Sequence, residues 1–309
     1  MKAICISQAG NLDSLMLLDV PVPAIADSEV LVRVKAIGVG IQDRWFLPRI
    51  ANYPYVIGIE AAGIIEKMGP AVAGFQPGDP VMFTSSMQPK GGVWAEFAAV
   101  RAEALLRIPA GLSFIQAAAL PVAGSTALES MALLDLKAGD SVFMAGASGA
   151  IGTLTIQLAK ALGCRVAASA SLKNHDYMRS LGAEKTVDYH DPDWMGEIRE
   201  WRPEGVDAAL AIQPGTGIGC LQVVRDGGRV VTVSGDQVPT ERGIHVAQVL
   251  PGPETKTRLA HLASEVAAGH IHLEIEQVYP FERGIEALEK TETRHARGKL
   301  ILTLAQQTA

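Results

Sequence analysis

The chain has 309 residues, of which 48% are hydrophobic and 19% are charged. This balance supplies apolar surface for a buried core and argues against intrinsic disorder. The length allows two domains, because single cores stop growing at roughly 250 to 300 residues. The formal net charge of −6 leaves no basic surplus for nucleic-acid phosphates or anionic lipid. We therefore expect a globular protein whose partner is a small molecule, with no nucleic acid and no membrane.

The cysteines and the apolar stretches bear on the compartment. Cys5, Cys164 and Cys220 stand far apart and form no Cys-x-x-Cys pair, so they do not suggest a disulfide framework. Charged residues or prolines interrupt every apolar stretch before about 18 residues accumulate, and the amino terminus lacks a basic region followed by an apolar run. We expect a soluble, unprocessed, cytoplasmic chain.

The first part of the chain, to about Leu120, is expected to be mainly β-structure. Short β-branched runs occur at 30–34 and 64–65. They are separated by turn-forming residues, namely Pro21, Pro23, Gly58, Gly69 and Gly78. Such spacing is typical of short strands joined by turns. The sequence therefore predicts a barrel-like, β-rich fold for this part.

After Ala117 strands and helices alternate. Helices are expected at 125–136, 154–162 and 174–181, and the strands at 141–145, 165–170, 185–189, 206–212 and 229–234, with a turn at 226–228. This order indicates βαβ units and a parallel, doubly wound sheet with ligands at the carboxyl ends of its strands. From about Gly269 onward the pattern predicts a strand at 275–279, a helix at 282–290 and a strand at 299–304.

A glycine-rich turn, Ala145-Gly146-Ala147-Ser148-Gly149-Ala150-Ile151-Gly152, lies between the strand at 141–145 and the next helix. Small residues let the backbone approach a pyrophosphate, which the N–H groups and dipole of the helix start then stabilise. In the strict Gly-x-Gly-x-x-Gly register the first glycine is replaced by alanine. A plain tight β-to-α connection is the alternative. The flanking strand, helix and next strand favour a dinucleotide site made of Ala147, Ser148, Gly149, Ala150, Ile151 and Gly152.

The end of the second strand of this unit distinguishes between the two nicotinamide dinucleotides. NAD sites usually carry Asp or Glu there, to bind the ribose 2′-hydroxyl. This chain has Ala168-Ser169-Ala170-Ser171-Leu172-Lys173, so hydroxyls and a cation replace the acid. A 2′-phosphate is then accepted without charge repulsion, with Lys173 as a ligand. We predict NADP(H) as the cofactor; the alternative for Lys173 is a solvated lysine at a helix start.

Six segments taken together carry a resemblance to a known family. They are GIEAAG at 58–63, GFQPGDPV at 74–81, GGVWAEF at 91–97, AAALPVAGSTA at 117–127, the glycine turn, and RGKLIL at 297–302. In this order they resemble the quinone oxidoreductase and zeta-crystallin-like branch of the medium-chain dehydrogenase/reductases. The resemblance covers essentially the whole chain. It implies an α/β protein in which a GroES-like β-rich catalytic domain, 1–120 and 265–309, carries an inserted Rossmann domain, 121–264, with the cofactor in the cleft between them, and it implies a homodimer.

The resemblance also implies cofactor-binding residues. In relatives that bind NADPH, a Ser-x-Lys after the second strand and a Tyr after the third line the 2′-phosphate pocket, and Ser171, Lys173 and Tyr189 match these. Tyr189 has packing at a strand end as its alternative role. Thr126 matches a threonine near the nicotinamide. The pair Ser234-Gly235 lies in the loop after the fifth strand, where relatives also contact the cofactor.

The segment 43–46 and Tyr53 resemble the family's substrate loop. Asp43 matches a recurrent family aspartate, which either braces the loop or takes part in the reaction. Trp45 either stacks on a flat acceptor or seals the interdomain cleft. Relatives often have Asn where Gly40 stands and Tyr where Trp45 stands. The candidate catalytic residues are therefore Asp43, Trp45, Tyr53 and Thr126, and none of them is an obligatory proton donor.

No metal is expected. Zinc alcohol dehydrogenases of the same superfamily need His or Cys ligands around an open position. The equivalent positions here are Gly40, Ile59 and Val122, and Glu60 alone does not make a site. The His-x-His at 270–272 has no third ligand nearby in sequence, which favours ordinary surface histidines.

These residues favour one reaction class. Without a Lewis acid, oxidation of a simple alcohol is hard to support. Hydride transfer from NADPH to a conjugated acceptor, a quinone or an α,β-unsaturated carbonyl compound, needs none, because hydroxyls, N–H groups or water can stabilise the developing charge. We expect an NADPH-dependent quinone or enone oxidoreductase. The alternatives are a non-catalytic NADPH-binding redox sensor and an enoyl-thioester reductase.

Overall fold

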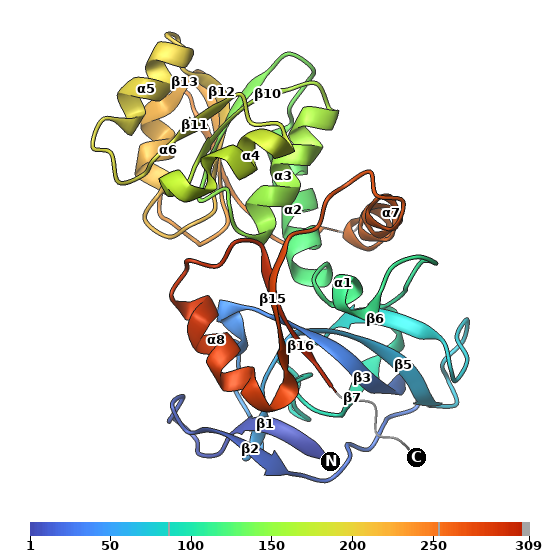
Figure 1. Cartoon of the computed structure of the whole chain (residues 1–309). Helices are drawn as coiled ribbons and strands as arrows, with labels where there is room; N and C mark the ends of the chain where they lie inside the picture. Colours follow the sequence, from blue (N-terminus) through green and yellow to red (C-terminus); the bar gives the residue numbers. More distant parts are fainter. Residues whose placement is uncertain (86, 253, 305–309) are drawn as a thin grey trace. The chain divides into compact units, whose positions relative to one another are not determined.

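The computed structural model describes residues 1–85, 87–252 and 254–304, which form two compact units (Figure 1). Within these ranges, unit 1 comprises Met1–Val122, Leu259–His270 and 275–304, and unit 2 comprises Ala123–Arg258 and Ile271–Glu274. The domain limits expected from the sequence remain predictions. No helix within the described ranges is both long and apolar enough to span a bilayer.

Unit 1 is built on two sheets. In the smaller sheet β1 (Lys2–Ile6) pairs antiparallel with β2 (Leu15–Asp19) and β4 (Tyr55–Val56). The larger sheet has the order β15-β16-β3-β5-β6-β8, with β7 also paired to β3. Its strands are β3 (Glu29–Val39), β5 (Glu60–Met68), β6 (Pro80–Thr84), β7 (Phe97–Arg101), β8 (Leu105–Arg107), β15 (Ile275–Pro280) and β16 (Lys299–Thr303). The strands β15 and β16 near the end of the chain thus join a sheet whose other strands lie within residues 29–107.

Short helical segments connect or cover these strands. They are η1 (Ile41–Asp43), η2 (Ala102–Ala104), α1 (Phe114–Ala118), η4 (Phe281–Arg283) and α8 (Gly284–Glu292), while α7 (Thr255–Ala267) runs from unit 2 into unit 1. The core between the sheets contains Ile4, Ile37, Phe83 and the fully buried Trp94. Gly58 has a φ of +101°, and a Cβ there would overlap the Trp94 ring, so only glycine fits beside this side chain.

Unit 2 contains a parallel sheet of six described strands in the order β11-β10-β9-β12-β13-β14. The strands are β9 (Ser141–Ala145), β10 (Arg165–Ser169), β11 (Lys185–Val187), β12 (Val206–Ala211), β13 (Val224–Thr232) and β14 (His245–Gln248). The order corresponds to 3-2-1-4-5-6, the arrangement of dinucleotide-binding folds, and it reverses between β9 and β12. The predicted doubly wound sheet and β-rich first part are therefore confirmed.

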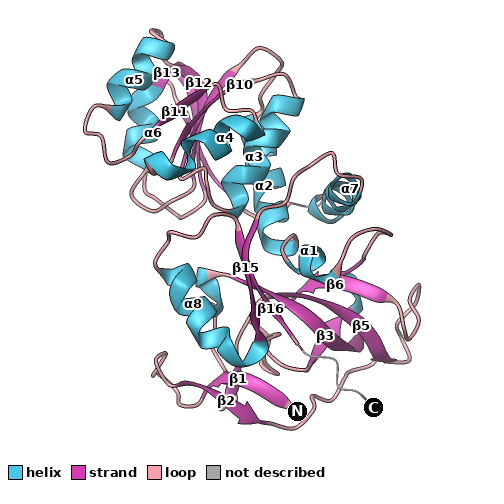
Figure 2. Cartoon of the chain, in the orientation of Figure 1, coloured by secondary structure: helices cyan, strands magenta, loops and turns pink. Residues whose placement is uncertain are grey.

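Helices cover both faces of this sheet (Figure 2). One face carries α2 (Pro121–Leu134), α3 (Ala150–Ala161), η3 (Leu172–Asn174) and α4 (His175–Leu181), and the other carries α5 (Trp194–Trp201) and α6 (Gly217–Val223). Val142 and Met144 of β9 belong to the first cluster, whereas Phe143 and Ala145 belong to the second. Successive side chains point to opposite faces, so a strand covered on both sides is apolar throughout.

The predicted turn at 226–228 is wrong in one respect. These residues lie inside β13, which begins at Val224 and ends two residues before the expected Ser234. The register between β12 and β13 shifts between Val206 and Ala208, and Gly227 has a φ of +70°. The glycines therefore form an irregularity within a strand instead of separating two elements. The edge strand β14 had no counterpart among the expected strands.

Candidate functional site

Apart from Thr126, which lies in α2, the predicted cofactor residues of unit 2 lie at the carboxyl ends of its parallel strands. The glycine turn joins β9 to α3, Ser171 and Lys173 follow β10, Tyr189 follows β11, and Ser234-Gly235 follows β13. Because all these strands run in the same direction, their carboxyl ends meet at one edge of the sheet. The structure thus brings these residues to the edge where doubly wound sheets bind ligands.

The glycine turn has the geometry of an anion cradle. Gly149 is the N-cap of α3, and the N–H groups of the helix's first turn have no helical carbonyl to which they can donate. A Cβ on Gly152 would overlap the backbone of Ala147, so this glycine lets α3 pack against the turn. A Cβ on Gly149 would come no closer than 3.9 Å to the carbonyl oxygen of Gly146. The turn is therefore tight at Gly152 and open at Gly149, which fits a pyrophosphate at the helix start.

Asn174 connects the glycine turn to the segment after β10. Its buried Nδ2 lies 3.3 Å from the hydroxyl oxygen of Ser148 and 3.3 Å from that of Ser171. From its sequence pattern, Asn174 is expected only to begin a helix. An amide directly after Ser-x-Lys, at a helix start, was the available signal. Lys173 and Tyr189 have exposed side chains, so both are free to meet a ligand from solvent.

Asp188 orders the same region from the end of β11. Its carboxylate accepts hydrogen bonds from the backbone N–H groups of His190 (3.0 Å) and Leu172 (3.3 Å), and its Oδ1 lies 2.7 Å from Nδ1 of His190. The N–H of His190 is the main reason that the pKa of Asp188 lies below its usual range. Asp188 therefore ties the segment carrying Lys173 to the one carrying Tyr189, a role that the sequence did not reveal.

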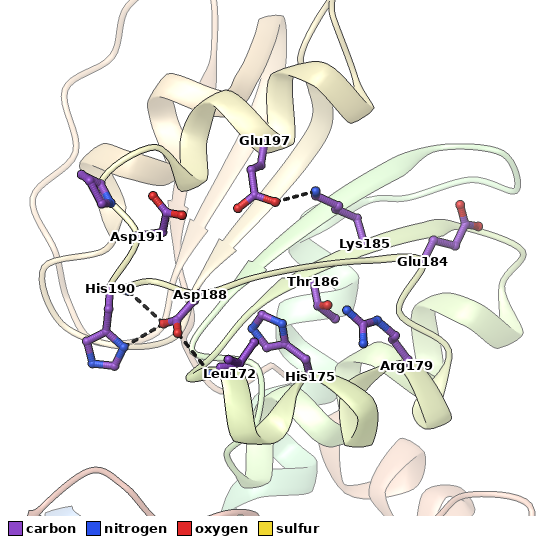
Figure 3. A pocket seen from close by; sticks show the side chains of 11 residues that line it. Leu172, His175, Arg179, Glu184, Lys185, Thr186, Asp188, His190, Asp191 and Glu197 are labelled. Carbon is purple, nitrogen blue, oxygen red and sulfur yellow. Dashed lines mark hydrogen bonds and ion pairs between the residues drawn. The ribbon is translucent and has the colours of Figure 1, made fainter.

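A pocket of about 720 Å³ opens beside this carboxylate, between α4 and the strand β11 (Figure 3). Both signs of charge line it: Lys185 forms an ion pair with Glu197 at 2.7 Å, and Asp188 faces His190. The pocket borders Leu172 but not Ser171 or Lys173. Its lining therefore carries no concentrated positive charge for a phosphate.

The loop after β13 is held by a carboxylate as well. Asp236 accepts hydrogen bonds from the N–H groups of Gly215 (3.0 Å) and Gly217 (2.8 Å) and lies 3.3 Å from the Ser234 hydroxyl. Burial acts to raise the pKa of Asp236, but these N–H donors outweigh it and the pKa is lowered. Asp236 thus joins the loops after β12 and β13, and Ser234 beside it is exposed.

In unit 1 the carboxyl group of Asp43 is buried at the end of η1. Its Oδ2 accepts a hydrogen bond from the N–H of Gly40 (2.8 Å). The pKa of Asp43 is raised to about 7, mainly because the carboxyl group is buried. The charge of Glu60 also raises this pKa, whereas the N–H of Gly40 and the charge of Lys299 act to lower it. This geometry braces the turn and leaves little of the carboxyl group accessible to a ligand.

Glu60 and Lys299 form a buried ion pair beside Asp43. Glu60 begins β5 and Lys299 begins β16, and the other carboxylate oxygen of Glu60 accepts the N–H of Val122 at 2.7 Å. Such a pair is costly to break, because a single buried charge would remain. Lys299 was quoted from the sequence only as part of a motif. Its partner lies on a strand far away in the chain, so the role became visible only in the folded sheet.

The positions matched from the sequence to zinc ligands of zinc alcohol dehydrogenases are Gly40, Ile59 and Val122. Gly40 and Val122 contribute backbone N–H groups to Asp43 and Glu60, and Ile59 is buried. Within the described ranges there is no group of three His, Cys, Asp or Glu side chains arranged to hold a metal ion. His270 and His272 are exposed, and each pairs with a carboxylate, Glu265 and Glu274 respectively.

The remaining candidate catalytic residues lie on separate elements. Trp45 and Tyr53 belong to the segment between η1 and β4, and both side chains are exposed. Asp43 adjoins this segment in sequence, but its own side chain is buried. Thr126 lies in α2 of unit 2 and is half-buried, and its carbonyl oxygen accepts the hydroxyl of Ser130 at 2.7 Å. The structure thus gathers three of the four candidates along one stretch of unit 1.

Comparisons with known proteins agree with this architecture. A family model described as alcohol dehydrogenase GroES-like domain matches residues 26–110, and one described as zinc-binding dehydrogenase matches residues 181–302. The quinone oxidoreductase of Sus scrofa is 30% identical over 98% of this chain and 98% of its own length. The chain belongs to the quinone oxidoreductase family. The NADPH-dependent alkenal/one oxidoreductase of Arabidopsis thaliana, a chloroplastic protein, is 32% identical over 98% of this chain and 79% of its own length.

Solved structures match the chain over nearly its whole length. The quinone oxidoreductase from Coxiella burnetii has a TM-score of 0.88 and 29% identity, covering 99% of both chains. A structure named NAD-dependent alcohol dehydrogenase has a TM-score of 0.90 and 26% identity over 99% of this chain and 100% of its own. The expected combination of a GroES-like domain with a Rossmann-type sheet is therefore confirmed for this member of the quinone oxidoreductase family.

Proposed function

We propose that this protein is an NADPH-dependent oxidoreductase that reduces quinones or α,β-unsaturated carbonyl compounds. The glycine turn at the start of α3, with Lys173 and no acid after β10, is the observation that carries the proposal. The protein's family membership supports the same activity, since its relatives include a quinone oxidoreductase and an NADPH-dependent alkenal/one oxidoreductase.

The chain's own residues fit NADPH as follows. The N–H groups at the start of α3 bind the pyrophosphate, aided by the helix dipole. Ser171, Lys173 and Tyr189 would hold the 2′-phosphate, to which a lysine can donate a charge-assisted hydrogen bond. Thr126 would contact the nicotinamide end, and the loop of Ser234-Gly235 would complete the cofactor site.

NADPH supplies the hydride when bound, and the protein orients the acceptor and stabilises the charge that develops on its oxygen. Trp45 and Tyr53 provide exposed aromatic surface on which a flat acceptor can stack. A conjugated acceptor that took up this hydride and a proton from solvent would be reduced by two electrons, an enone to the saturated ketone and a quinone to the hydroquinone. The buried Asp43 braces the turn from which the segment carrying Trp45 begins.

We propose further that this reduction proceeds without zinc. The positions of the zinc ligands carry Gly40, Ile59 and Val122, whose side chains offer no nitrogen, sulfur or oxygen donor. Glu60 beside them is neutralised by Lys299. Conjugated acceptors are already electrophilic, so the reaction does not depend on a Lewis acid.

We also propose that the protein is cytoplasmic and forms a homodimer. Support for a reducing compartment comes from the three cysteines, which are free and buried. The homodimer rests on the resemblance to the family. Sedimentation equilibrium at micromolar concentration tests it: a mass near twice 32.7 kDa is expected, and a mass of one chain would refute it.

Binding and turnover together test the proposed activity. Titration of the purified protein with NADPH and with NADH is expected to give at least about tenfold tighter binding of NADPH. Lys173→Ala should remove most of that preference, whereas Lys137→Ala, beside the amino end of β9, should not change it. The NADPH-loaded protein should then reduce 1,4-benzoquinone, 9,10-phenanthrenequinone or a 2-alkenal over many turnovers.

Other outcomes of the same assay separate the alternatives. Tight NADPH binding without turnover of any acceptor would favour a redox sensor. Turnover of a crotonyl thioester but not of quinones would favour an enoyl-thioester reductase. Absence of NADPH binding would refute the role given to the glycine turn.

A further inference from the structure

The segment 44–54 joins η1 to β4 without any helix or strand of its own. Three large apolar side chains on it are exposed to solvent: Trp45 by 59%, Phe46 by 54% and Ile50 by 79%. Loops between secondary-structure elements often carry binding residues, and clustered exposed apolar side chains often mark ligand-contact surface. Such a surface needs something that fixes its backbone.

Arg44, the first residue of this segment, is buried and makes four hydrogen bonds to distant parts of unit 1. Its Nε donates to Glu292 Oε1 at 2.7 Å and its Nη2 to Oε2 of the same carboxylate at 3.2 Å. Its Nη1 donates to the carbonyl oxygen of Leu12 at 3.2 Å and to Oδ1 of Asp13 at 3.0 Å. The guanidinium thus joins the segment to the last residue of α8 and to the loop between β1 and β2.

The two carboxylates that Arg44 meets differ in their surroundings. The Asp13 side chain is 95% exposed, so water screens its attraction to the guanidinium. The Glu292 side chain is only 26% exposed and accepts two parallel bonds, an arrangement that an arginine fork makes and a lysine cannot. Glu292 is therefore the partner that fixes the direction of Arg44.

Trp45 and Phe46 belong to the same backbone turn as Arg44, so fixing Arg44 also fixes them. Both of their backbone N–H groups donate to the carbonyl oxygen of Gln42, at 3.0 and 2.8 Å, so they continue the turn that contains Arg44. A hollow of about 620 Å³ opens between Trp45 and α8. Because this side of the indole has no close packing, the orientation of the segment depends on hydrogen bonds instead of a filled core.

We propose that Arg44 is a positioning residue: through its paired bonds to Glu292 it holds Trp45 and Phe46 in place to bind flat, aromatic acceptors such as polycyclic quinones. This role rests on the proposed function, because it assigns the acceptor to that segment. Small acceptors depend less on Arg44, since they cover little of the aromatic surface.

Glu292→Gln tests the proposal, with Asp13→Asn as the matched control on the same guanidinium. For Glu292→Gln the KM for 9,10-phenanthrenequinone should rise about five- to tenfold, with a much smaller rise for 1,4-benzoquinone and little change in kcat. The Kd for NADPH should stay unchanged. Asp13→Asn should leave both KM values, kcat and the Kd for NADPH within about twofold of the parent protein. Arg44→Lys, which keeps the charge but loses the fork, should behave like Glu292→Gln.

Amide hydrogen exchange over residues 41–53 provides a readout independent of turnover. Exchange there should be faster in Glu292→Gln than in the parent protein and in Asp13→Asn, with the strands of unit 1 unchanged. Equal exchange, or a KM that rises equally for both quinones, would overturn the proposal. If no acceptor is reduced, the proposed function fails by itself: faster exchange then still assigns Arg44 to holding the segment, and unchanged exchange removes that role too.

Discussion

At the scale of single residues, Asp43 stands out because its carboxyl group is buried next to two other ionisable groups, Glu60 and Lys299. Removal from water disfavours the charged form of a carboxyl group, and here that effect exceeds the attraction of Lys299. The folded protein therefore binds a proton at Asp43 more tightly than the unfolded chain does. This makes the free energy of unfolding depend on pH near neutrality.

Asp43→Asn should reveal this dependence. The pKa of Asp43 is about 7 in the folded protein against an ordinary value of 3.8, so the folded state holds more protons between these limits and loses stability as the pH rises through them. The asparagine variant lacks this titration. Its free energy of unfolding should gain on the parent protein by at most about 1.4 kcal/mol per pH unit from pH 4 to 7, and no further above that.

Urea unfolding at pH 5, 6, 7 and 8 measures the difference. Asp13→Asn, which removes an exposed carboxyl group, serves as the control and should follow the parent protein. Parallel pH profiles for Asp43→Asn and the parent protein would show that Asp43 is ionised throughout.

At the scale of elements, the junction of β9 and α3 separates two demands on glycine. Gly152→Ala would place a methyl group into the backbone of Ala147, so α3 must shift. We expect a loss of about 2 kcal/mol or more in the free energy of unfolding, together with weaker NADPH binding. Gly149→Ala has room for its methyl group in the protein and should cost at most about 1 kcal/mol, yet it should still weaken NADPH binding by narrowing the phosphate approach.

Urea unfolding and NADPH titration of the two variants check this expectation. Equal stability of Gly152→Ala and Gly149→Ala would contradict the packing role of Gly152. Unchanged NADPH binding in Gly149→Ala would argue against a pyrophosphate at the start of α3.

At the scale of the whole molecule, a cofactor that binds only the folded state must stabilise it. NADPH at 100 times its Kd should raise the free energy of unfolding by about 2.7 kcal/mol. NADH at the same concentration should contribute less, and Lys173→Ala should make the two cofactors nearly equal. Thermal unfolding with each cofactor measures this. Equal shifts in the parent protein would refute the predicted preference for NADPH.

Much of the architecture followed from local sequence pattern. The apolar runs of β9, β10 and β12 and the glycine turn after β9 were identified correctly, because a strand buried on both faces must be apolar and a tight β-to-α turn must be small. The irregular strand β13 was not predicted correctly, because its glycines resemble a turn locally and only pairing with β12 keeps them in a strand. Edge strand β14 is short and half-exposed, so its pattern is weak.

The sequence by itself determined the class of fold, the edge of the sheet at which the proposed cofactor residues lie and the absence of an acid directly after β10. Only the tertiary structure decided which charges meet. Arg44 and Glu292 are 248 residues apart, and Lys299 reaches Glu60 because β3 pairs with β16 on one side and with β5 on the other. The physical reason is that secondary structure reflects the periodicity of neighbouring residues, whereas a buried ion pair requires two segments to be brought within hydrogen-bond distance away from water.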